Sequence, residues 1–347
     1  MKKKKVAILH AQVPFVRGGA ELMVESLKRE LILRDFDADI ISVPFKWYPE
    51  YSLYNSMLEW RLLDLSESNG QKIDLVIGTK FPSYGAEHGN KVIWMIQQYR
   101  QAYDLYDSQY GLSGQPNGAL IRDKVKCYDE KVVPEGKHIY TISQNVSNRL
   151  NRYNGIQSEP LYQPPPLVGK YKDGDCGDYI CSVGRLDKLK RNDLLIRSLA
   201  HCNKNVKLKI AGRGPEMEPL KELANKLRVA DQVEFLGFVP DDKLVDLYAG
   251  SRGVFFAPVD EDYGFITLEA FLSKKPVITC EDAGGVLEFV DDGVSGFITA
   301  PKEEEIAEKI SLLFEDANKC VSFGQAGYEK VKEISWDHVI ECLTQSL

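Results

Sequence analysis

The sequence predicts an α/β protein built from two doubly wound domains that face each other across a cleft. Short β-rich runs alternate with helical periods along the whole chain, which is typical of parallel sheets covered by helices. A proline-rich break at 163–166 interrupts the pattern, and the same alternation restarts beyond it. The chain has 347 residues, enough for two hydrophobic cores.

The first half contains five short runs rich in aliphatic residues that we expect to be buried strands. These runs are 5–10, 39–43, 74–77, 92–95 and 139–142. A loop ending in Gly18-Gly19 follows the first run, and an amphipathic pattern over 20–33 predicts a helix after it.

The break consists of three consecutive prolines at 164–166, followed by a stretch over 169–178 that is rich in Gly and Asp. Proline fixes φ and removes a backbone donor, so neither a helix nor a central strand survives there. We therefore predict one domain over 1–165 and a second over 166–330. The last segment, 331–347, is expected to form a helix that packs back on the first domain.

The second half repeats the alternation with a strand at 179–183 and a helix near 191–201. The remaining expected strands are 206–210, 232–235, 253–257 and 276–279, and the remaining expected helices are 216–228, 241–249, 265–272 and a helical tail from 301. Open α/β sheets of this kind bind ligands beyond the carboxyl ends of their strands.

Composition and charge exclude several classes of protein. The hydrophobic content is 44% and the charged content 27%, which excludes extensive disorder. A net charge of −7 argues against a nucleic-acid partner. No apolar run approaches the roughly 20 residues of a membrane span, and the basic start 1–5 lacks the apolar run of a signal peptide. We expect a cytoplasmic protein whose basic start could touch the inner membrane surface.

Cysteines give no sign of a metal site or of a disulfide framework. The seven cysteines are scattered, with no Cys-x-x-Cys pair and no histidine at zinc spacing. We expect free thiols. Asp-x-Asp strings also occur, but those at 35–37, 37–39 and 173–175 fall in turns or in the break. No metal is therefore predicted.

Two glutamates eight positions apart form the strongest candidate site. Glu261 lies in the loop after a strand, and Glu269 lies inside the following helix. Between them, Gly264 permits close backbone approach, and the free N–H groups at the helix start suit an anion. Two carboxylates beside such a site suit the hydroxyls of a sugar and of a ribose on either side of a diphosphate.

A basic loop follows the first strand of the second half. Arg185 and Lys190 would project from it toward the cleft. A guanidinium and an ammonium five residues apart can neutralise a diphosphate, including a leaving group that gains charge.

These motifs in this order resemble glycosyltransferase family 4, enzymes of the GT-B fold with two Rossmann-like domains. The matching segments are Gly184-Arg185-Leu186 with Lys190, Gly212-Arg213-Gly214-Pro215, Glu261 with Glu269-Ala270, Pro276-Val277-Ile278 and Gly284-Gly285-Val286-Leu287-Glu288. They cover most of 180–300. The first half matches less tightly, through Gly18-Gly19-Ala20-Glu21 and the proline-rich break.

The resemblance implies a metal-independent, retaining transferase that moves a sugar from a UDP- or GDP-sugar to a hydroxyl acceptor. It assigns acceptor binding to 1–165 and nucleotide-sugar binding to 166–330. The acceptor would be a glycan or a lipid-linked saccharide, as in polysaccharide biosynthesis. The leaving phosphate itself would deprotonate the acceptor on the same face.

The resemblance also implies a role for each matching position. Arg185, Lys190 and Glu261 are the catalytic candidates, the first two on the diphosphate and the third on the sugar hydroxyls. Glu269 would take the ribose hydroxyls. The other donor-binding candidates are Gly19, Arg213, Gly214, Val239, Tyr263, Gly264, Phe265, Ile266 and Thr267.

The sequence departs from the family pattern at two places. Arg191 follows Lys190 where the family prefers glycine. Many members carry a histidine in the cleft loop after the strand at 92–95, but here that position falls to Gln97, which cannot titrate. His10, His88 and His138 are the alternatives for that role. We name Gln97, Arg100 and Trp47 as acceptor-side candidates, since aromatic residues crowd 44–51 and 99–110.

Other functions remain as alternatives or are excluded. A dinucleotide-dependent dehydrogenase would need Gly-x-Gly-x-x-Gly directly after the first strand, and the chain has a loop of nine residues there instead, 11–19, which ends in Gly18-Gly19. A nucleotide-sugar epimerase should lack the Glu261 and Glu269 arrangement. A non-catalytic nucleotide-sugar-binding protein is the remaining alternative.

Overall fold

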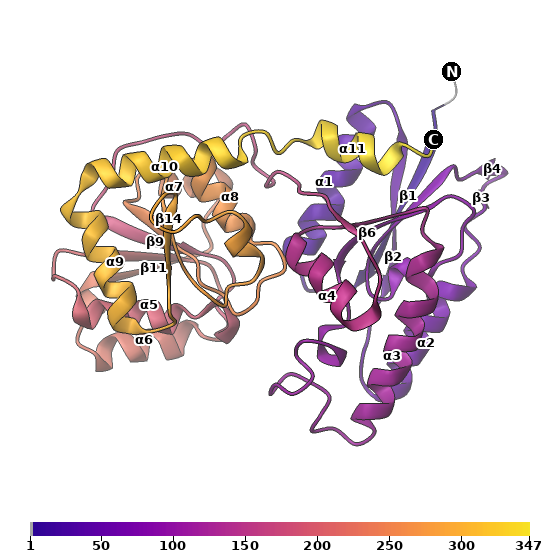
Figure 1. Ribbon diagram of the computed structural model, residues 1–347, viewed down its shortest axis with the longest axis horizontal. Helices are drawn as coiled ribbons and strands as arrows, with labels where there is room; N and C mark the ends of the chain where they lie inside the picture. The colour runs from indigo at the N-terminus through magenta and orange to yellow at the C-terminus, as the bar shows by residue number, and fades with distance from the viewer. Residues whose placement is uncertain (1–2) are drawn as a thin grey trace. The chain divides into compact units, whose positions relative to one another are not determined.

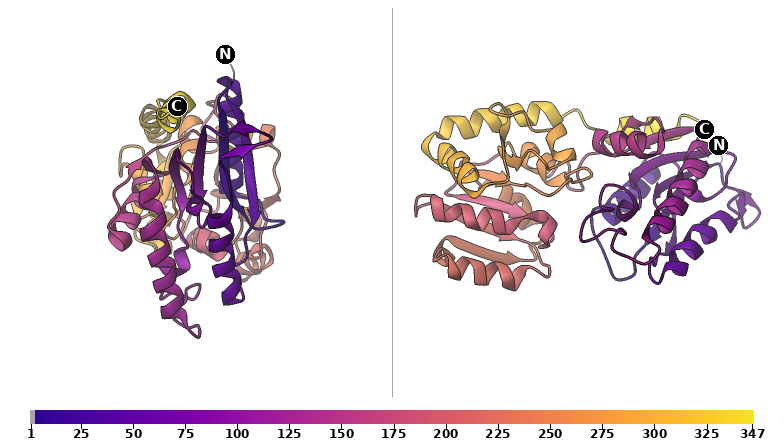
Figure 2. Two further views of the ribbon diagram at one scale, coloured as in Figure 1. Left: turned by 90° about the vertical axis from the view of Figure 1, so that its right-hand side faces the viewer. Right: turned by 60° about the horizontal axis from the view of Figure 1, so that its bottom comes forward.

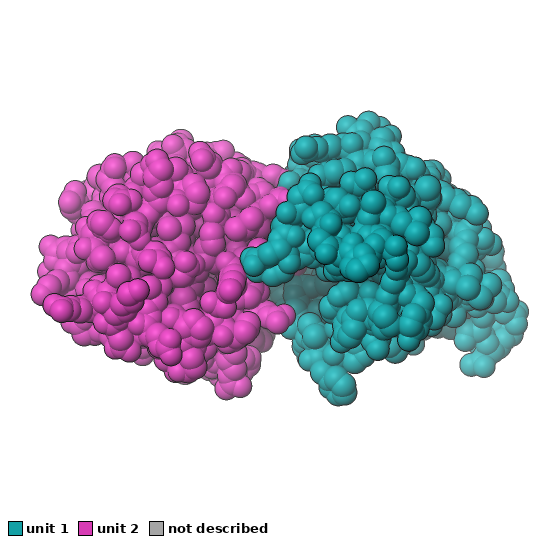
Figure 3. Space-filling view, turned by 90° about the horizontal axis from the view of Figure 1, so that it is seen from below, with its two compact units in different colours: residues 1–166, 335–347 teal, residues 167–334 magenta. Residues whose placement is uncertain are grey.

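The computed structural model describes residues 3–347, so Met1 and Lys2 of the basic start lie outside the described part. The chain divides into two compact units (Figures 1 and 3). The first unit runs to Pro166 and also takes in Ser335–Leu347, and the second is Leu167–Ile334.

The first unit is built on a parallel sheet with the strand order β2-β1-β5-β6-β7-β8. Its strands are β1 (Lys5–Gln12), β2 (Asp37–Pro44), β5 (Leu75–Lys80), β6 (Lys91–Gln97), β7 (His138–Thr141) and β8 (Glu159–Pro160), with a small hairpin of β3 (Glu67–Ser68) and β4 (Gln71–Lys72). Its helices are α1 (Gly19–Leu33), α2 (Glu50–Leu62), α3 (Gly118–Val132), α4 (Gln144–Asn154) and α11 (Trp336–Thr344).

The second unit has a parallel sheet with the strand order β11-β10-β9-β12-β13-β14. Its strands are β9 (Tyr179–Val183), β10 (Lys207–Ala211), β11 (Val233–Gly237), β12 (Gly253–Phe255), β13 (Val277–Cys280) and β14 (Gly296–Thr299). Its helices are α5 (Asn192–Ser198), α6 (Met217–Lys226), α7 (Asp241–Ala249), α8 (Phe265–Leu272), α9 (Glu303–Glu315) and α10 (Ala317–Val331). Helices cover both faces of each sheet (Figures 1 and 2), so the predicted α/β class with two doubly wound units is confirmed.

Each sheet reverses its strand order at one point, and this reversal positions the candidate site. In the first unit β1 lies between β2 and β5, and in the second β9 lies between β10 and β12. Consecutive helices leave opposite faces of the sheet at such a point, so the loops beyond the carboxyl ends of the two central strands diverge and leave room for a ligand.

The helix α11 belongs to the first unit although it ends the chain. The Trp336 ring packs edge-on against Trp94 of β6, with ring centroids 6.2 Å apart. At the surface, Asp337 accepts a hydrogen bond from the Arg34 Nε at 3.0 Å. A chain end more than 200 residues away thus completes the core of the first sheet.

None of the helices within residues 3–347 combines the length and the apolar character needed to cross a membrane.

Candidate functional site

Lys190 and Glu261 meet beyond the carboxyl ends of β9 and β12. Their Nζ and Oε2 atoms are 2.5 Å apart, although 71 residues separate them in the chain. The Lys190 and Glu261 side chains are 21% and 28% exposed, so both remain accessible to a ligand. The Lys190 ammonium also lies 5.3 Å from the centroid of the Phe256 ring. The structure therefore brings two of the three predicted catalytic residues into contact at the point where the sheet order reverses.

The loop that carries Glu261 is held by the neighbouring loop after β13. The Glu261 N–H donates to the Ala283 carbonyl at 3.0 Å, and the Gly285 N–H donates to the Glu261 carbonyl at 2.7 Å. A Cβ on Gly285 would lie 2.7 Å from the Asp262 carbonyl oxygen. The paired glycines of the motif at 284–285 thus allow two loops to pack backbone to backbone.

A second glycine motif fits the loop after β10 against the loop after β9. Gly212 has φ +141°, and a Cβ there would lie 1.7 Å from the Gly184 carbonyl oxygen. A Cβ on Gly214 would lie 2.1 Å from the Leu186 carbonyl oxygen. Because only glycine fits such contacts, these two positions shape the loops at this edge of the sheet.

Arg191 occupies the position where the family that the sequence resembles prefers glycine, and the Arg191 backbone has φ +50°. Its guanidinium donates to the Ala257 and Pro258 carbonyl oxygens at 2.7 and 2.8 Å and pairs with Asp282 at 2.6 Å. The side chain therefore ties together the loops after β9, β12 and β13. Its charge is engaged by these partners.

The start of α8 presents backbone N–H groups beside this pair. Gly264, with φ +89°, caps the helix, and a Cβ there would lie 2.9 Å from the Val286 side chain. Tyr263 is buried and packs edge-on against Phe265 and Phe289. The Thr267 hydroxyl is buried, with no partner among the described residues. A helix start with free N–H groups favours an anion.

Glu269 is only 9% exposed, and its Oε2 accepts a hydrogen bond of 2.6 Å from the Tyr248 hydroxyl. Burial raises the pKa of this carboxyl, and the hydrogen bond from Tyr248 acts in the opposite direction. The two glutamates of the motif thus have different surroundings. Glu261 is accessible beside a lysine, while Glu269 lies inside the helix layer.

The remaining donor-side candidates of this unit lie on neighbouring loops. The Arg185 side chain is 64% exposed, with its Nε 4.0 Å from Asp187. The Arg213 guanidinium lies 5.9 Å from the centroid of the exposed Phe238 ring. Val239, half-buried, follows in the same loop after β11.

The corresponding edge of the first sheet holds a buried charged cluster. Glu21, in the first turn of α1, lies 3.3 Å from the His10 Nε2 and 3.1 Å from the Lys80 Nζ, and it accepts the Gly18 N–H at 2.8 Å. Burial alone would raise the pKa of Glu21, but these three partners lower it to about 2. Gly19, predicted to approach the donor, is the exposed first residue of α1.

Beside this cluster lies a cavity of about 180 Å³ that contains two of the acceptor-side candidates, Trp47 and Gln97. The cavity is lined by Val13, Phe45, Trp47, Lys80, Phe81, Gln97, Gln98, Tyr99 and Gln101. The third candidate, Arg100, is not among these residues and pairs with Asp104 at 2.5 Å. Lys80 was missed by the sequence analysis, although its place at the end of a buried strand could have indicated it.

The three alternative histidines lie in different places. His10 is buried near the carboxyl end of β1, within the charged cluster. His88 accepts the Asn90 N–H through Nδ1 at 3.0 Å, and His138 stacks on Tyr140 at the start of β7. Only His10 therefore lies near the carboxyl edge of the sheet.

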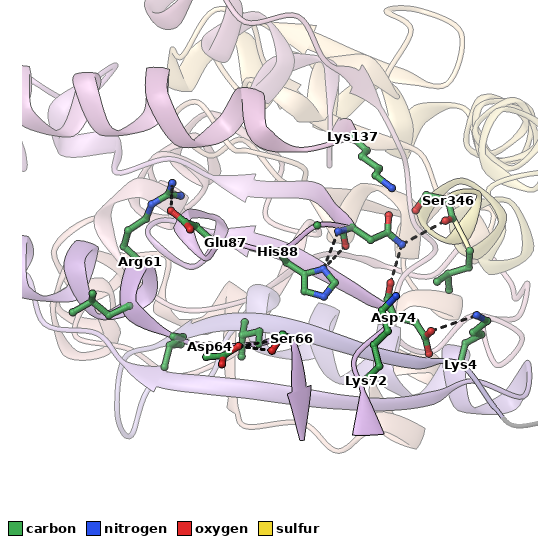
Figure 4. Close-up of a pocket in the computed structure, with 16 residues that line it drawn as sticks. Lys4, Arg61, Asp64, Ser66, Lys72, Asp74, Glu87, His88, Lys137 and Ser346 are labelled. Atoms are coloured by element: carbon green, nitrogen blue, oxygen red, sulfur yellow. Dashed lines mark hydrogen bonds and ion pairs between the residues drawn. The ribbon is translucent and has the colours of Figure 1, made fainter. Parts of the chain in front are cut away.

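A cavity of about 800 Å³ lies at the opposite edge of the first sheet (Figure 4). Lys4, Asp74, Asn90 and Lys137 line it, and each directly precedes a strand. Several of its polar groups already pair with one another, as Lys4 does with Asp74 at 3.3 Å. We do not assign the candidate site here, because open α/β sheets bind ligands at the carboxyl ends of their strands.

One group of possible metal ligands occurs within residues 3–347, formed by His201, Glu303 and Glu304. The His201 Nε2 lies 3.7 Å from Glu303, and the two side chains are 40% and 35% exposed. An exposed histidine and two glutamates of this kind form an ordinary surface ion pair, so they carry no metal assignment.

Comparison with known proteins supports the family resemblance. The family described as glycosyl transferases group 1 matches residues 171–330. D-inositol 3-phosphate glycosyltransferase from Nocardia farcinica is 28% identical over 300 residues, which are 70% of this chain and 66% of that protein. GDP-mannose-dependent alpha-(1-6)-phosphatidylinositol monomannoside mannosyltransferase from Mycobacterium tuberculosis is 31% identical over 193 residues, 51% of this chain and 50% of that protein.

The chain thus spans between half and two thirds of the length of these curated relatives. Among solved structures, Anabaena HepE in complex with UDP and glucose superimposes with a TM-score of 0.72 at 17% identity, covering 99% of both chains. At this identity the likeness shows the fold, which is GT-B. Residues 171–330 of the chain are thus similar to the glycosyl transferases group 1 family.

Proposed function

We propose that the protein is a retaining glycosyltransferase that moves a sugar from a UDP- or GDP-sugar to a hydroxyl acceptor. The observation that carries the proposal is the contact between Lys190 and Glu261, close to the start of α8, where no side chain caps the helix. Names of similar proteins support the same activity, since one relative is GDP-mannose-dependent and the HepE structure holds UDP and glucose.

The donor would bind along the loops after β9 and β12. Its diphosphate would lie between Lys190, the accessible Arg185 and the start of α8, where each group neutralises negative charge. Glu261 would then release the lysine and accept hydroxyls of the sugar. When the bond between the anomeric carbon and the diphosphate breaks, negative charge grows on the leaving group, and the same two cations would stabilise it.

Glu269 would contribute from a more rigid position. Its Oε2 is held by Tyr248, and we propose that the rest of the carboxyl group orients the ribose. Arg213 and Val239, on the loops after β10 and β11, would line the base. The buried hydroxyl of Thr267 would complete the donors at the helix start.

The acceptor would enter the cavity that holds Trp47 and Gln97. At about 180 Å³, this cavity has room for one sugar ring. Aromatic walls from Phe45, Trp47, Phe81 and Tyr99 would pack against the apolar face of a ring, and the glutamines would bond its hydroxyls. A glycan or a lipid-linked saccharide could present such a ring.

A nucleotide-binding screen followed by a product assay tests the proposal. We expect UDP or GDP, and the matching nucleotide sugar, to raise the melting temperature, with the shift unchanged by EDTA. A ligand at about 100 times its Kd stabilises the fold by roughly 2.7 kcal/mol, which is measurable. Release of nucleoside diphosphate with an acceptor panel measures transfer, and the anomeric configuration of the product tests retention.

The outcomes separate the proposal from its alternative. Binding with transfer and retention supports it. Binding without transfer to any acceptor would favour a non-catalytic nucleotide-sugar-binding protein. If no uridine, guanosine or adenosine diphosphate shifts the melting temperature, the donor site is wrongly assigned.

A further inference from the structure

Two cysteines of the second unit lie in contact, away from the residues assigned to the donor. The Cys176 Sγ is 2.7 Å from the Cys320 Sγ, although 144 residues separate them in the chain. Both are free thiols. A disulfide has an S–S length near 2.05 Å, so a small side-chain movement would close this pair.

The contact is held by packing on the Cys176 side. The buried Lys275 ammonium donates to the Gly174 and Asp175 carbonyl oxygens at 2.5 and 3.3 Å. Just beyond Cys176, a Cβ on Gly177 would lie 2.0 Å from the Gly250 carbonyl oxygen. The segment around Cys176 therefore packs closely against the rest of the second unit.

The Cys320 side is equally constrained. Cys320 lies in the first turn of α10, is buried, and donates through Sγ to the Arg252 carbonyl at 2.9 Å. Further along α10, a Cβ on Gly324 would lie 1.9 Å from the Lys274 carbonyl oxygen. The approach of the two sulfurs thus follows from close packing on both sides.

A cavity of about 530 Å³ gives small molecules access to the pair. Its lining includes Asp173–Cys176 together with Lys274, Lys275 and three residues of α10. Cys176 is half-buried and lines the cavity, while Cys320 does not. Burial raises the pKa of the Cys320 thiol to about 12, so it remains protonated near neutral pH. Cys176 is therefore the thiol that would react first.

We propose that Cys176 and Cys320 form a reversible disulfide when the protein meets an oxidant such as a low-molecular-weight disulfide or hydrogen peroxide. With a disulfide oxidant, the Cys176 thiolate attacks one sulfur and expels the other half as a thiolate. The Cys320 thiol then loses its proton as it attacks the Cys176 Sγ and expels the second half. The pair loses two electrons and two protons, and the oxidant gains them as two thiols.

With hydrogen peroxide, the Cys176 thiolate takes one oxygen and becomes a sulfenic acid, with release of hydroxide. Attack by Cys320 then forms the disulfide and releases water. In a reducing compartment the pair stays open, so closure reports oxidation.

Closure would link the segment after the proline-rich break to α10. The loop enclosed by Cys176 and Cys320 spans most of the second unit, and cross-linking a loop of this length restricts the unfolded chain strongly. Helix α10 in turn packs closely on α8, since a Cβ on Gly327 of α10 would lie 2.2 Å from the Phe271 ring of α8. Oxidation should therefore stabilise the unit that contains the candidate donor site.

Peptide mapping of the folded, full-length protein tests the proposal. After treatment with oxidised glutathione or peroxide and alkylation, tryptic peptide 173–185 should be joined to 320–330. Because Cys181 shares the first peptide, fragmentation must place the bond at Cys176. The melting temperature should rise by at least about 4 °C and return after reduction with dithiothreitol.

Matched variants complete the test. C176S, at a half-buried position, should fold, lose the cross-link and lose the oxidation-dependent rise in melting temperature. C127S, which removes an exposed cysteine of the first unit, should retain both. The proposal fails if the cross-link forms only in urea, if it joins Cys181 instead, or if C176S keeps the temperature shift.

Discussion

At the scale of single residues, we expect the contact between Lys190 and Glu261 to matter for activity more than for stability. The pair is partly exposed, and exposed ion pairs contribute about 0–1 kcal/mol. Removing either side chain should therefore leave the fold intact while removing a group that we propose contacts the donor.

We predict that K190A and E261A each lower kcat for sugar transfer by about 10²–10³-fold, because each removes a group that stabilises the transition state. Steady-state kinetics measures the loss, and the melting temperature should change little. K188A, two residues away on the same turn and exposed, serves as the control and should keep its activity. Full activity in K190A or E261A would contradict the assigned site.

Glycine positions give a second prediction at this scale. G212A should destabilise the protein by about 3 kcal/mol, since the new Cβ meets a backbone oxygen at 1.7 Å and the φ of +141° is strained for alanine. G237A is the matched variant, with φ +63° and open space around the added Cβ. G237A should lower the free energy of unfolding by about 1 kcal/mol. Chemical denaturation compares the two, and equal losses would refute the role of backbone contact.

At the scale of elements, α3 anchors the loop beside the acceptor cavity through a buried carboxylate. Asp129 accepts hydrogen bonds from the Tyr84 and Tyr103 hydroxyls at 2.8 and 2.7 Å and from the Gln98 amide at 3.1 Å. Burial raises the pKa of Asp129 to about 6, against the opposing effect of these hydrogen bonds. This hydrogen bond from the Gln98 amide to Asp129 fixes the orientation of Gln98, which lines the cavity.

This raised pKa predicts a pH dependence of stability with a definite sign. The folded protein holds the Asp129 proton more tightly than the unfolded chain, whose Asp pKa is near 3.9. The protonated Asp129 therefore contributes to the free energy of unfolding in full below about pH 4. This contribution is lost as the pH rises through 6, a change of about 3 kcal/mol. D129N, which cannot ionise, should lack this loss.

Melting temperatures of wild type and D129N between pH 4 and 7 test the prediction, since their difference should change with pH. D123N is the control, because Asp123 lies on the same helix with a side chain that is 67% exposed. Parallel curves for wild type and D129N would show that Asp129 does not titrate in this range.

At the scale of the whole molecule, the last residues of the chain, Ser335–Leu347, belong to the first unit and not to the second unit that precedes them. Trp336 packs on Trp94 and is buried in the first unit. W336A should destabilise that unit by about 3–5 kcal/mol, the usual cost of truncating a buried tryptophan. Calorimetry should show a lower unfolding temperature for the first unit and an unchanged unfolding temperature for the second.

The matched variant for this prediction is E341A, a solvent-facing change on the same helix α11, which should leave both transitions in place. If W336A lowered both transitions equally, the two units would unfold as one cooperative body. Binding of a donor nucleotide should raise the transition of the second unit in either variant.

Much of the fold could be predicted from periodicity. The expected helices at 241–249 and 265–272 and the strand at 179–183 have the same bounds in the structure. Most other predicted elements differ from the observed ones by one to three residues at an end, but the helix predicted over 331–347 begins only at Trp336. The helices α2, α3 and α4 and the strand β14 were not predicted. The helix α2 follows an aromatic-rich stretch with little apolar periodicity, and β14 has four residues, too few to show a pattern.

By itself, the sequence determined the two α/β units and the motif residues of the second unit, because local periodicity and loop composition depend on neighbours in the chain. Tertiary structure alone decided that Lys190 meets Glu261, that Arg191 ties three loops together, and that Cys176 reaches Cys320. The physical reason is that parallel strands bring the loops at their carboxyl ends to one edge, whatever their distance in sequence. Which side chains then touch depends on backbone packing at a few glycines, which no local pattern encodes.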